Sequence, residues 1–234
     1  MKQKESPETS LWISTTDLMS GLLVVFLFVA VLMNEESAKK QEFIDEVTGQ
    51  RQQTYAMLDK KFDDYFTPEE REAYNLDDPG DIGHASFAHG EGRFLQGSEK
   101  ITPEFARVLD DFLPKYIKAI RDCESQHIQE IRIEGHTSSE WHHDVSPDQA
   151  YIYNMQLSQS RTREIIKYAL NMSCFTEDDR RFIKEKLTAN GLSSSHLIKY
   201  TDGNENAEAS RRIEFRVVTD DAALIDRIAR ERNL

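Results

Sequence analysis

A long apolar run near the N-terminus constrains the fold of this chain more than any other feature. Residues 11–33 read LWISTTDLMSGLLVVFLFVAVLM, and about 20 helical residues cross the roughly 30 Å hydrocarbon core of a bilayer. A cleaved signal peptide is the alternative, but no small-x-small cleavage site follows the run, which passes directly into Asn34, Glu35 and Glu36. The sequence therefore predicts an uncleaved transmembrane helix over residues 11–33.

Charged residues on either side of this run bear on its orientation. Lys2 and Lys4 precede it, whereas Glu35 and Glu36 follow it at once. The positive-inside rule then places residues 1–10 in the cytoplasm and the larger C-terminal part on the other side of the membrane.

Asp17 is the acidic residue of the apolar run. One interpretation makes it a helix N-cap at the membrane surface, but a span starting at Leu18 is only about 24 Å long. With Trp12 as an interfacial anchor, Asp17 lies inside the membrane. An ionised carboxylate there costs at least about 2.5–3.5 kcal/mol, so it must face protein or water. Ser14 and Gly21 share its helical face and permit close helix packing. We expect a functional carboxylate; a plain structural contact is the alternative.

Composition bears on two classes of function. The 42 acidic residues outnumber the 29 basic ones, for a net charge of -13, and such a chain repels the phosphates of nucleic acid. Cys123 and Cys174 have no C-x-x-C or other metal-ligand spacing, which argues against zinc and thiol-redox chemistry. Outside the cytoplasm they can form a disulfide; two buried free thiols are the alternative.

A charged connector of residues 34–81 follows the membrane segment. Its apolar residues fall near a 3–4 spacing, which predicts an amphipathic helix that ends at about Phe66 and can pair with a second copy. A solvated spacer is equally compatible with this pattern. Thr67 and Pro68 then predict a capped second, shorter helix. The apolar residues of the first helix are Ile44, Val47, Leu58, Phe62 and Tyr65.

Helical and strand patterns alternate in residues 82–234. A first helix is predicted from Thr102 towards Cys123, and Pro114 should perturb it. Further helices are predicted over 150–170, 177–186 and the tail from residue 220. Strands are predicted within 86–95 and over 128–135 and 213–217. This order indicates an α+β domain, a sandwich in which helices cover one face of a small mixed sheet.

Two polar segments of this domain are candidate sites. The first contains His136, Glu140, His142 and His143. These residues lie in a predicted loop without the helical spacing of H-E-x-x-H, so we expect a hydrogen-bonded loop and no metal or cofactor. In the second, Asn154, Leu157, Ser158 and Arg161 share one helical face, where the guanidinium can bind a carboxylate through two parallel hydrogen bonds. An ordinary surface arginine is the alternative.

These residues resemble the OmpA-like peptidoglycan-binding domain. Gly135-His136-Thr137 is similar to the family's G-H-T-D loop, residues 154–161 to its N-x-x-L-S-x-x-R helix, and residues 211–214 to its N-R-R-V-E strand. Ser138 stands where the family has the aspartate that holds the amine of diaminopimelate, and Ser210 where it has asparagine. The resemblance implies peptidoglycan contacts by Tyr153, Asn154, Leu157, Arg161 and Ser138.

An acidic membrane helix joined to such a domain resembles the MotB family of stator subunits. The segment T-D-L-M-S-G-L-L-V-V-F-L around Asp17 is most similar to the ZorB family, the MotB-like subunits of Zorya anti-phage systems. The resemblance implies a bacterial inner-membrane homodimer within a ring of MotA-like (ZorA) polytopic subunits, with lipid around the complex. It also implies that the C-terminal domain lies in the periplasm on peptidoglycan and that Asp17 carries ions, protons rather than sodium.

Three other functions are compatible with the same outline. They are a flagellar MotB-type stator subunit, a passive peptidoglycan anchor, and a subunit like TolR or ExbD, which the OmpA-like motifs disfavour. No nucleophile–base pair or phosphate-binding loop is visible in the sequence, so we do not expect an enzyme.

Overall fold

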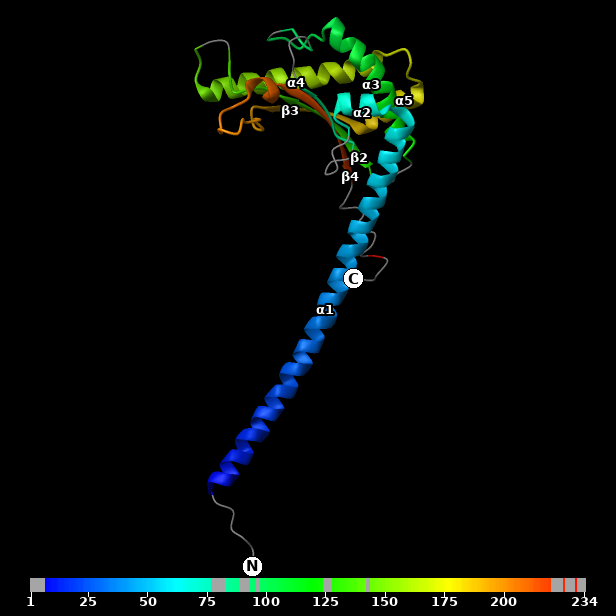
Figure 1. The fold of residues 1–234 in the computed structure, drawn as a ribbon. Coiled ribbons are helices and arrows are strands. Elements are labelled where there is room, and N and C mark those ends of the chain that lie inside the picture. The colour runs from blue at the N-terminus through cyan, green and yellow to red at the C-terminus, as the bar shows by residue number, and fades with distance from the viewer. Residues whose placement is uncertain are drawn as a thin grey trace, which may run out of the picture. The chain divides into compact units, whose positions relative to one another are not determined.

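The computed structural model describes residues 7–76, 83–88, 93–95, 97–123, 128–141 and 144–219, together with Ile225 and Arg230. For residues 7–17, 50, 51 and 88 it describes the backbone alone. The chain divides into two compact units, Met1–Gln50 and Arg51–Leu234. Figure 1 shows the ribbon of both.

The first unit consists of the N-terminal part of helix α1 (Pro7–Tyr65). Its apolar side chains between Leu18 and Met33 are exposed, Leu18 to 75% and Val29 to 44%. In the described part of the chain, α1 is the helix that is long and apolar enough to cross a membrane. Because α1 already begins at Pro7, Asp17 lies inside the helix, and the interpretation of Asp17 as an N-cap is wrong.

The second unit begins with the C-terminal turns of α1, where Leu58 and Phe62 are buried in the hydrophobic core. The helix ends at Tyr65, one residue before the end at about Phe66 that the spacing of its apolar residues predicts. Thr67 then caps α2 (Pro68–Tyr74) through a capping box with Glu70, which confirms the predicted second helix.

Arg71 of α2 ties that helix to the last turns of α1. Its Nη2 lies 2.5 Å from Asp59 Oδ1 and its Nη1 2.8 Å from Asp63 Oδ1. Phe66, between the two helices, is buried in the same core. The end of the connector segment is therefore packed as part of the second unit.

The sheet of the second unit has four strands in the order β1-β4-β2-β3. β4 pairs antiparallel with both β1 and β2, and β3 pairs parallel with β2, so the predicted mixed sheet is confirmed. The sequence pattern missed β3, and β2 runs one residue further than predicted. The strands are β1 (Ala85–Ala88), β2 (Ile128–His136), β3 (Leu187–Ser193) and β4 (Arg212–Thr219).

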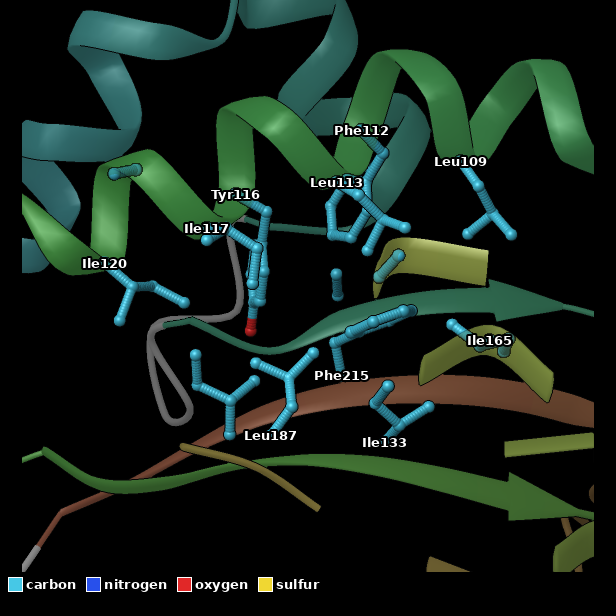
Figure 2. Packing of buried hydrophobic residues seen from close by; sticks show 14 of the residues in the cluster. Leu109, Phe112, Leu113, Tyr116, Ile117, Ile120, Ile133, Ile165, Leu187 and Phe215 are labelled. Carbon is cyan, nitrogen blue, oxygen red and sulfur yellow. The ribbon is translucent and has the colours of Figure 1, made fainter. Parts of the chain in front are cut away.

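Helix α3 (Pro103–Arg121) supplies one side of the core. Figure 2 shows its inward residues, among them Phe112 and Tyr116, directed at Phe215 of β4 and Ile133 of β2. The Tyr116 and Phe215 rings lie 5.7 Å apart, centroid to centroid. Pro114 does not end the helix, because residues on both sides of it pack into the same core. The mixed α+β class predicted from the sequence is confirmed.

Helices α4 (Pro147–Asn171) and α5 (Glu177–Lys186) connect β2 to its parallel neighbour β3. Ser146 caps α4 through a capping box with Gln149, so this helix starts three residues before the predicted position, whereas α5 has the predicted bounds. Figure 1 shows α3, α4 and α5 gathered on one side of the sheet. A short helix, α6 (Ala207–Ser210), precedes β4. The helix predicted from residue 220 lies outside the described residues, apart from the isolated Ile225 and Arg230.

Both cysteines are free thiols. Cys123 is buried, but Cys174 is exposed. The interpretation as a disulfide is therefore wrong. The alternative of two buried free thiols is right about the free thiols, but only Cys123 is buried.

Candidate functional site

A short loop, residues 137–141, continues from the C-terminal end of β2 and is held on several sides. Asn154 Nδ2 of α4 donates hydrogen bonds to the carbonyl oxygens of Ser138 and Glu140, each at 3.2 Å. The backbone N–H of Ser139 donates to Glu205 Oε1 at 3.0 Å. The loop is therefore fixed by side chains from elements that are distant in sequence.

Ser138 faces the interior of this arrangement and is 4% exposed. Its Oγ accepts a hydrogen bond from Arg211 Nη1 at 3.2 Å, and the same Nη1 lies 3.7 Å from Glu140 Oε2. Ser138 thus offers a neutral, already bonded hydroxyl. Its predicted contact with peptidoglycan stays a prediction.

The inner face of α4 lies close against β2 and β3. Asn154 is 3% and Ser158 1% exposed, and the backbone N–H of Ser193 donates to Ser158 Oγ at 3.2 Å. Gly135 permits this approach, since a Cβ there would come within 2.8 Å of the Ser158 carbonyl oxygen. The glycine of the first motif and the serine of the second therefore pack directly on one another.

Arg161 lies one turn further along α4 and is only 5% exposed. Its Nε donates to the Ser98 carbonyl oxygen at 3.0 Å, and its Cζ lies 5.0 Å from the centroid of the Phe94 ring. Within the described residues no acidic side chain reaches ion-pair distance of its guanidinium. Burial lowers the pKa of Arg161 to about 10, with a smaller contribution from Arg211 and an opposing one from Glu99. A buried guanidinium without an ion pair among the described residues is suited to binding an anion.

An aromatic pair joins the end of the 137–141 loop to α4. The Trp141 and Tyr153 rings are 5.3 Å apart, centroid to centroid, and tilted by 36°. They line a shallow pocket of about 200 Å³ together with Glu99, Gln156, Leu157 and Ser160. Tyr153 and Leu157 were predicted as site residues. Trp141 and Glu99 were not, because only the folded chain brings them to this helix.

His136 belongs to a buried ionic cluster below the loop. Its Nε2 lies 3.5 Å from Glu214 Oε2 and 3.9 Å from Glu134 Oε2. These three side chains offer one ligand atom each within 4.8 Å of one another, but Arg212 Nε is 2.5 Å from Glu214 Oε1 and Arg216 Nε is 3.6 Å from Glu134 Oε2. Each carboxylate thus has a guanidinium partner, so the donor set does not fit a divalent cation well. His142 and His143 lie outside the described residues.

The pKa of Glu214 reflects this cluster. Burial by itself raises the pKa, but the imidazoles of His136 and His84 and the guanidinium of Arg212 outweigh it and hold the pKa well below its usual range. Glu214 is therefore charged in the folded domain.

Sequence similarity to known proteins identifies the family of this chain. The OmpA family matches residues 93–211, which contain the 135–137 and 154–161 motifs. A Zorya protein ZorB from Escherichia coli strain Crooks is 34% identical over 232 residues, which is 97% of this chain and 96% of that protein. The chain belongs to the ZorB family. This confirms the resemblance seen in the sequence.

The comparisons also give matches at lower sequence identity. A Zorya protein ZorB from a second Escherichia coli strain is 24% identical over 226 residues, 92% of this chain and 83% of that protein. Among solved structures, a putative MotB-like protein from Desulfovibrio vulgaris is 20% identical (TM-score 0.46) and covers 76% of this chain and 98% of its own. The periplasmic domain of Helicobacter pylori MotB is 15% identical (TM-score 0.42) and covers 64% and 87%.

Proposed function

We propose that this chain is the ion-conducting subunit of a MotA/MotB-like inner-membrane motor that is anchored to peptidoglycan and acts in Zorya anti-phage defence. The proposal rests on membership of the ZorB family together with one feature of α1. Asp17 is an acidic residue inside a helix whose following residues, 18–33, are apolar and exposed. A membrane carboxylate is a functional residue by default, because its burial in lipid is costly.

Asp17 would carry the ion by changing its charge. A proton needs only a carboxylate to bind it, and binding neutralises a group that the low-dielectric membrane disfavours in its ionised form. The membrane potential supplies about 2.3 kcal/mol per elementary charge per 100 mV. One proton passing through Asp17 can therefore bias a step of a ring of ZorA-type subunits around a dimer of this chain.

The C-terminal domain would hold that dimer in place on the cell wall. Arg161 supplies a buried guanidinium for a carboxylate of the peptide stem. The 137–141 loop, fixed by Asn154 and Glu205, supplies a rigid rim. With residues 1–10 in the cytoplasm, this domain lies in the periplasm, where the wall is.

Replacing the membrane carboxylate by its neutral isostere tests the proposal. Asp17→Asn, introduced into the complete defence system, should leave expression and complex assembly intact and abolish protection from phage. Asp45→Asn makes the same change on the connector part of α1 and should retain protection. Retained protection in Asp17→Asn overturns the ion-carrier role.

A further variant, Arg161→Ala, distinguishes the proposed function from that of a passive wall anchor. In that case Asp17→Asn is silent, whereas Arg161→Ala, which removes the buried guanidinium, abolishes protection. Under the proposed function both variants lose protection, and only Arg161→Ala fails to co-sediment with isolated peptidoglycan.

A further inference from the structure

A single hydroxyl side chain lies within the apolar part of α1. Residues 18–33 contain no charged, amide or hydroxyl side chain other than Ser20. Because α1 is helical from Pro7 onwards, Ser20 follows Asp17 by three residues on one continuous helix. Two residues at this spacing share a face and are separated by about 4.5 Å along the axis. The hydrogen-bonding side chain of this apolar part is therefore the neighbour of the membrane carboxylate.

Polar side chains are distributed unevenly on the two sides of Asp17. Residues 14–16, which precede it, read S-T-T and all carry hydroxyl groups. On the other side Ser20 stands alone, because residues 21–33 are glycine or apolar. In this chain, a side-chain donor for the carboxylate can therefore come from several residues towards the N-terminus but only from Ser20 towards the apolar part.

The surroundings of Ser20 leave its hydroxyl free to rotate. Ser20 is exposed on the described chain, and a Cβ added at Gly21, the next residue, would meet nothing within 4 Å. A serine within a helix ordinarily donates to the carbonyl oxygen four residues earlier, which here belongs to Thr16. Rotation of the side chain turns the same O–H towards a carboxylate three residues earlier, with no change in the backbone.

We propose that Ser20 is a positioning residue for ion transfer at Asp17. Its hydroxyl donates to the carboxylate of Asp17 while that group is ionised, and returns to the Thr16 carbonyl oxygen when Asp17 is protonated. A hydrogen bond to the ionised form offsets part of the cost of a charge in a low-dielectric environment. Ser20 thereby eases release of the proton from Asp17 and keeps its own proton throughout. The inference rests on the proposed ion-carrier function.

Removal of the hydroxyl in the complete complex tests this role. In infrared spectra of the complex reconstituted in lipid vesicles, the protonated carboxyl band of Asp17 is the band that Asp17→Asn lacks. In Ser20→Ala this band should persist to a pH about one unit higher than in the wild type, as for loss of one hydrogen bond to a charged group. Protection from phage should fall about ten-fold, because the proton is released less readily.

Two matched variants separate positioning from helix packing. Ser20→Thr keeps a hydroxyl three residues after Asp17 and should retain the wild-type band and protection. Met19→Ser combined with Ser20→Ala moves the hydroxyl about 200° around the helix from Asp17, and should behave like Ser20→Ala alone.

The possible failures of Ser20 and of the ion-carrier function are distinguishable. An Asp17 band in Ser20→Ala that disappears at the wild-type pH overturns the role of Ser20, because any loss of protection then reflects packing. Wild-type protection in Ser20→Ala, with protection lost in Asp17→Asn, overturns the role of Ser20 alone. Retained protection in Asp17→Asn overturns the ion-carrier function and the role of Ser20 with it.

Discussion

The backbone of Gly191 lies directly against Gln159: a Cβ added at Gly191 would come within 2.4 Å of the Gln159 nitrogen and 2.8 Å of its Cα. Gly135, on the neighbouring strand β2, also lies close against the backbone of Ser158 in α4. Main-chain atoms of a packed helix cannot move aside as the end of a flexible side chain can. These two glycines therefore set the distance between the sheet and α4, the helix that carries Asn154 and Arg161.

Gly191→Ala should accordingly destabilise the domain by about 1–3 kcal/mol, the usual cost of overpacking. Thermal unfolding of the purified chain, followed by near-UV circular dichroism, measures the effect. Gly49→Ala is the control, because a Cβ there meets nothing within 4 Å and alanine favours a helix. An unfolding temperature of Gly191→Ala equal to that of the wild type would show that α4 is not held at this distance.

Asn154→Ala should loosen the 137–141 loop. The substitution leaves the carbonyl oxygens of Ser138 and Glu140 without their donor, at a cost of about 1–3 kcal/mol in stability. It should also weaken co-sedimentation with isolated peptidoglycan. Asn171→Ala removes a side-chain amide from the exposed end of the same helix and should do neither. Equal binding by the two variants would exclude a role of the loop in wall attachment.

Glu214→Gln should destabilise the domain in a pH-dependent way. Removing one partner of a buried ion pair costs about 3 kcal/mol or more, and Glu214 is only 7% exposed. The folded-state pKa of Glu214 is held below its ordinary value of 4.5. Its stabilising contribution is therefore complete above that pH and declines as the pH falls below it.

Urea unfolding at about pH 7, 5 and 3.5 measures this dependence, with Glu208→Gln on the exposed face of α6 as the control. The difference in unfolding free energy between wild type and Glu214→Gln should be constant between the two higher pH values and smaller at the lowest. A difference that grows as the pH falls would contradict the lowered pKa.

The two thiols should react at very different rates. In the native chain N-ethylmaleimide should label exposed Cys174, while buried Cys123 should react only in denaturant. Mass spectrometry of the labelled peptides distinguishes the two sites. A chain that takes up no label even when denatured, and takes up two after reduction, would establish a disulfide instead.

The sequence alone could predict those elements whose pattern is local. Helix α3 was predictable because Phe105, Leu109, Phe112 and Tyr116 recur at helical spacing. β3 was missed because only Leu187 and Ser193 at its two ends are buried, so no alternation is visible. Its position depends on parallel pairing with β2 and on the contact between Gly191 and Gln159, and both arise from the tertiary fold.

The candidate site was predictable to a similar degree. Arg161 and Asn154 lie in a motif of one helix, so they could be selected from spacing and resemblance. Glu99 and Trp141 come from two separate loops, and their approach to Tyr153 follows only from the packing of α4 on the sheet. The partner of Ser138, Arg211, was likewise hidden by its distance along the chain.

The burial of Arg161 links wall attachment to folding. The fold holds a desolvated guanidinium without a carboxylate partner among the described residues, an arrangement that lowers stability until an anion is bound. A ligand that binds only the folded domain raises the free energy of unfolding by RT ln(1 + L/Kd), where L is the free ligand concentration, so the gain grows with the ligand concentration relative to Kd. In the proposed motor, the domain would then resist mechanical unfolding most strongly while it is attached to the wall, when it carries the load.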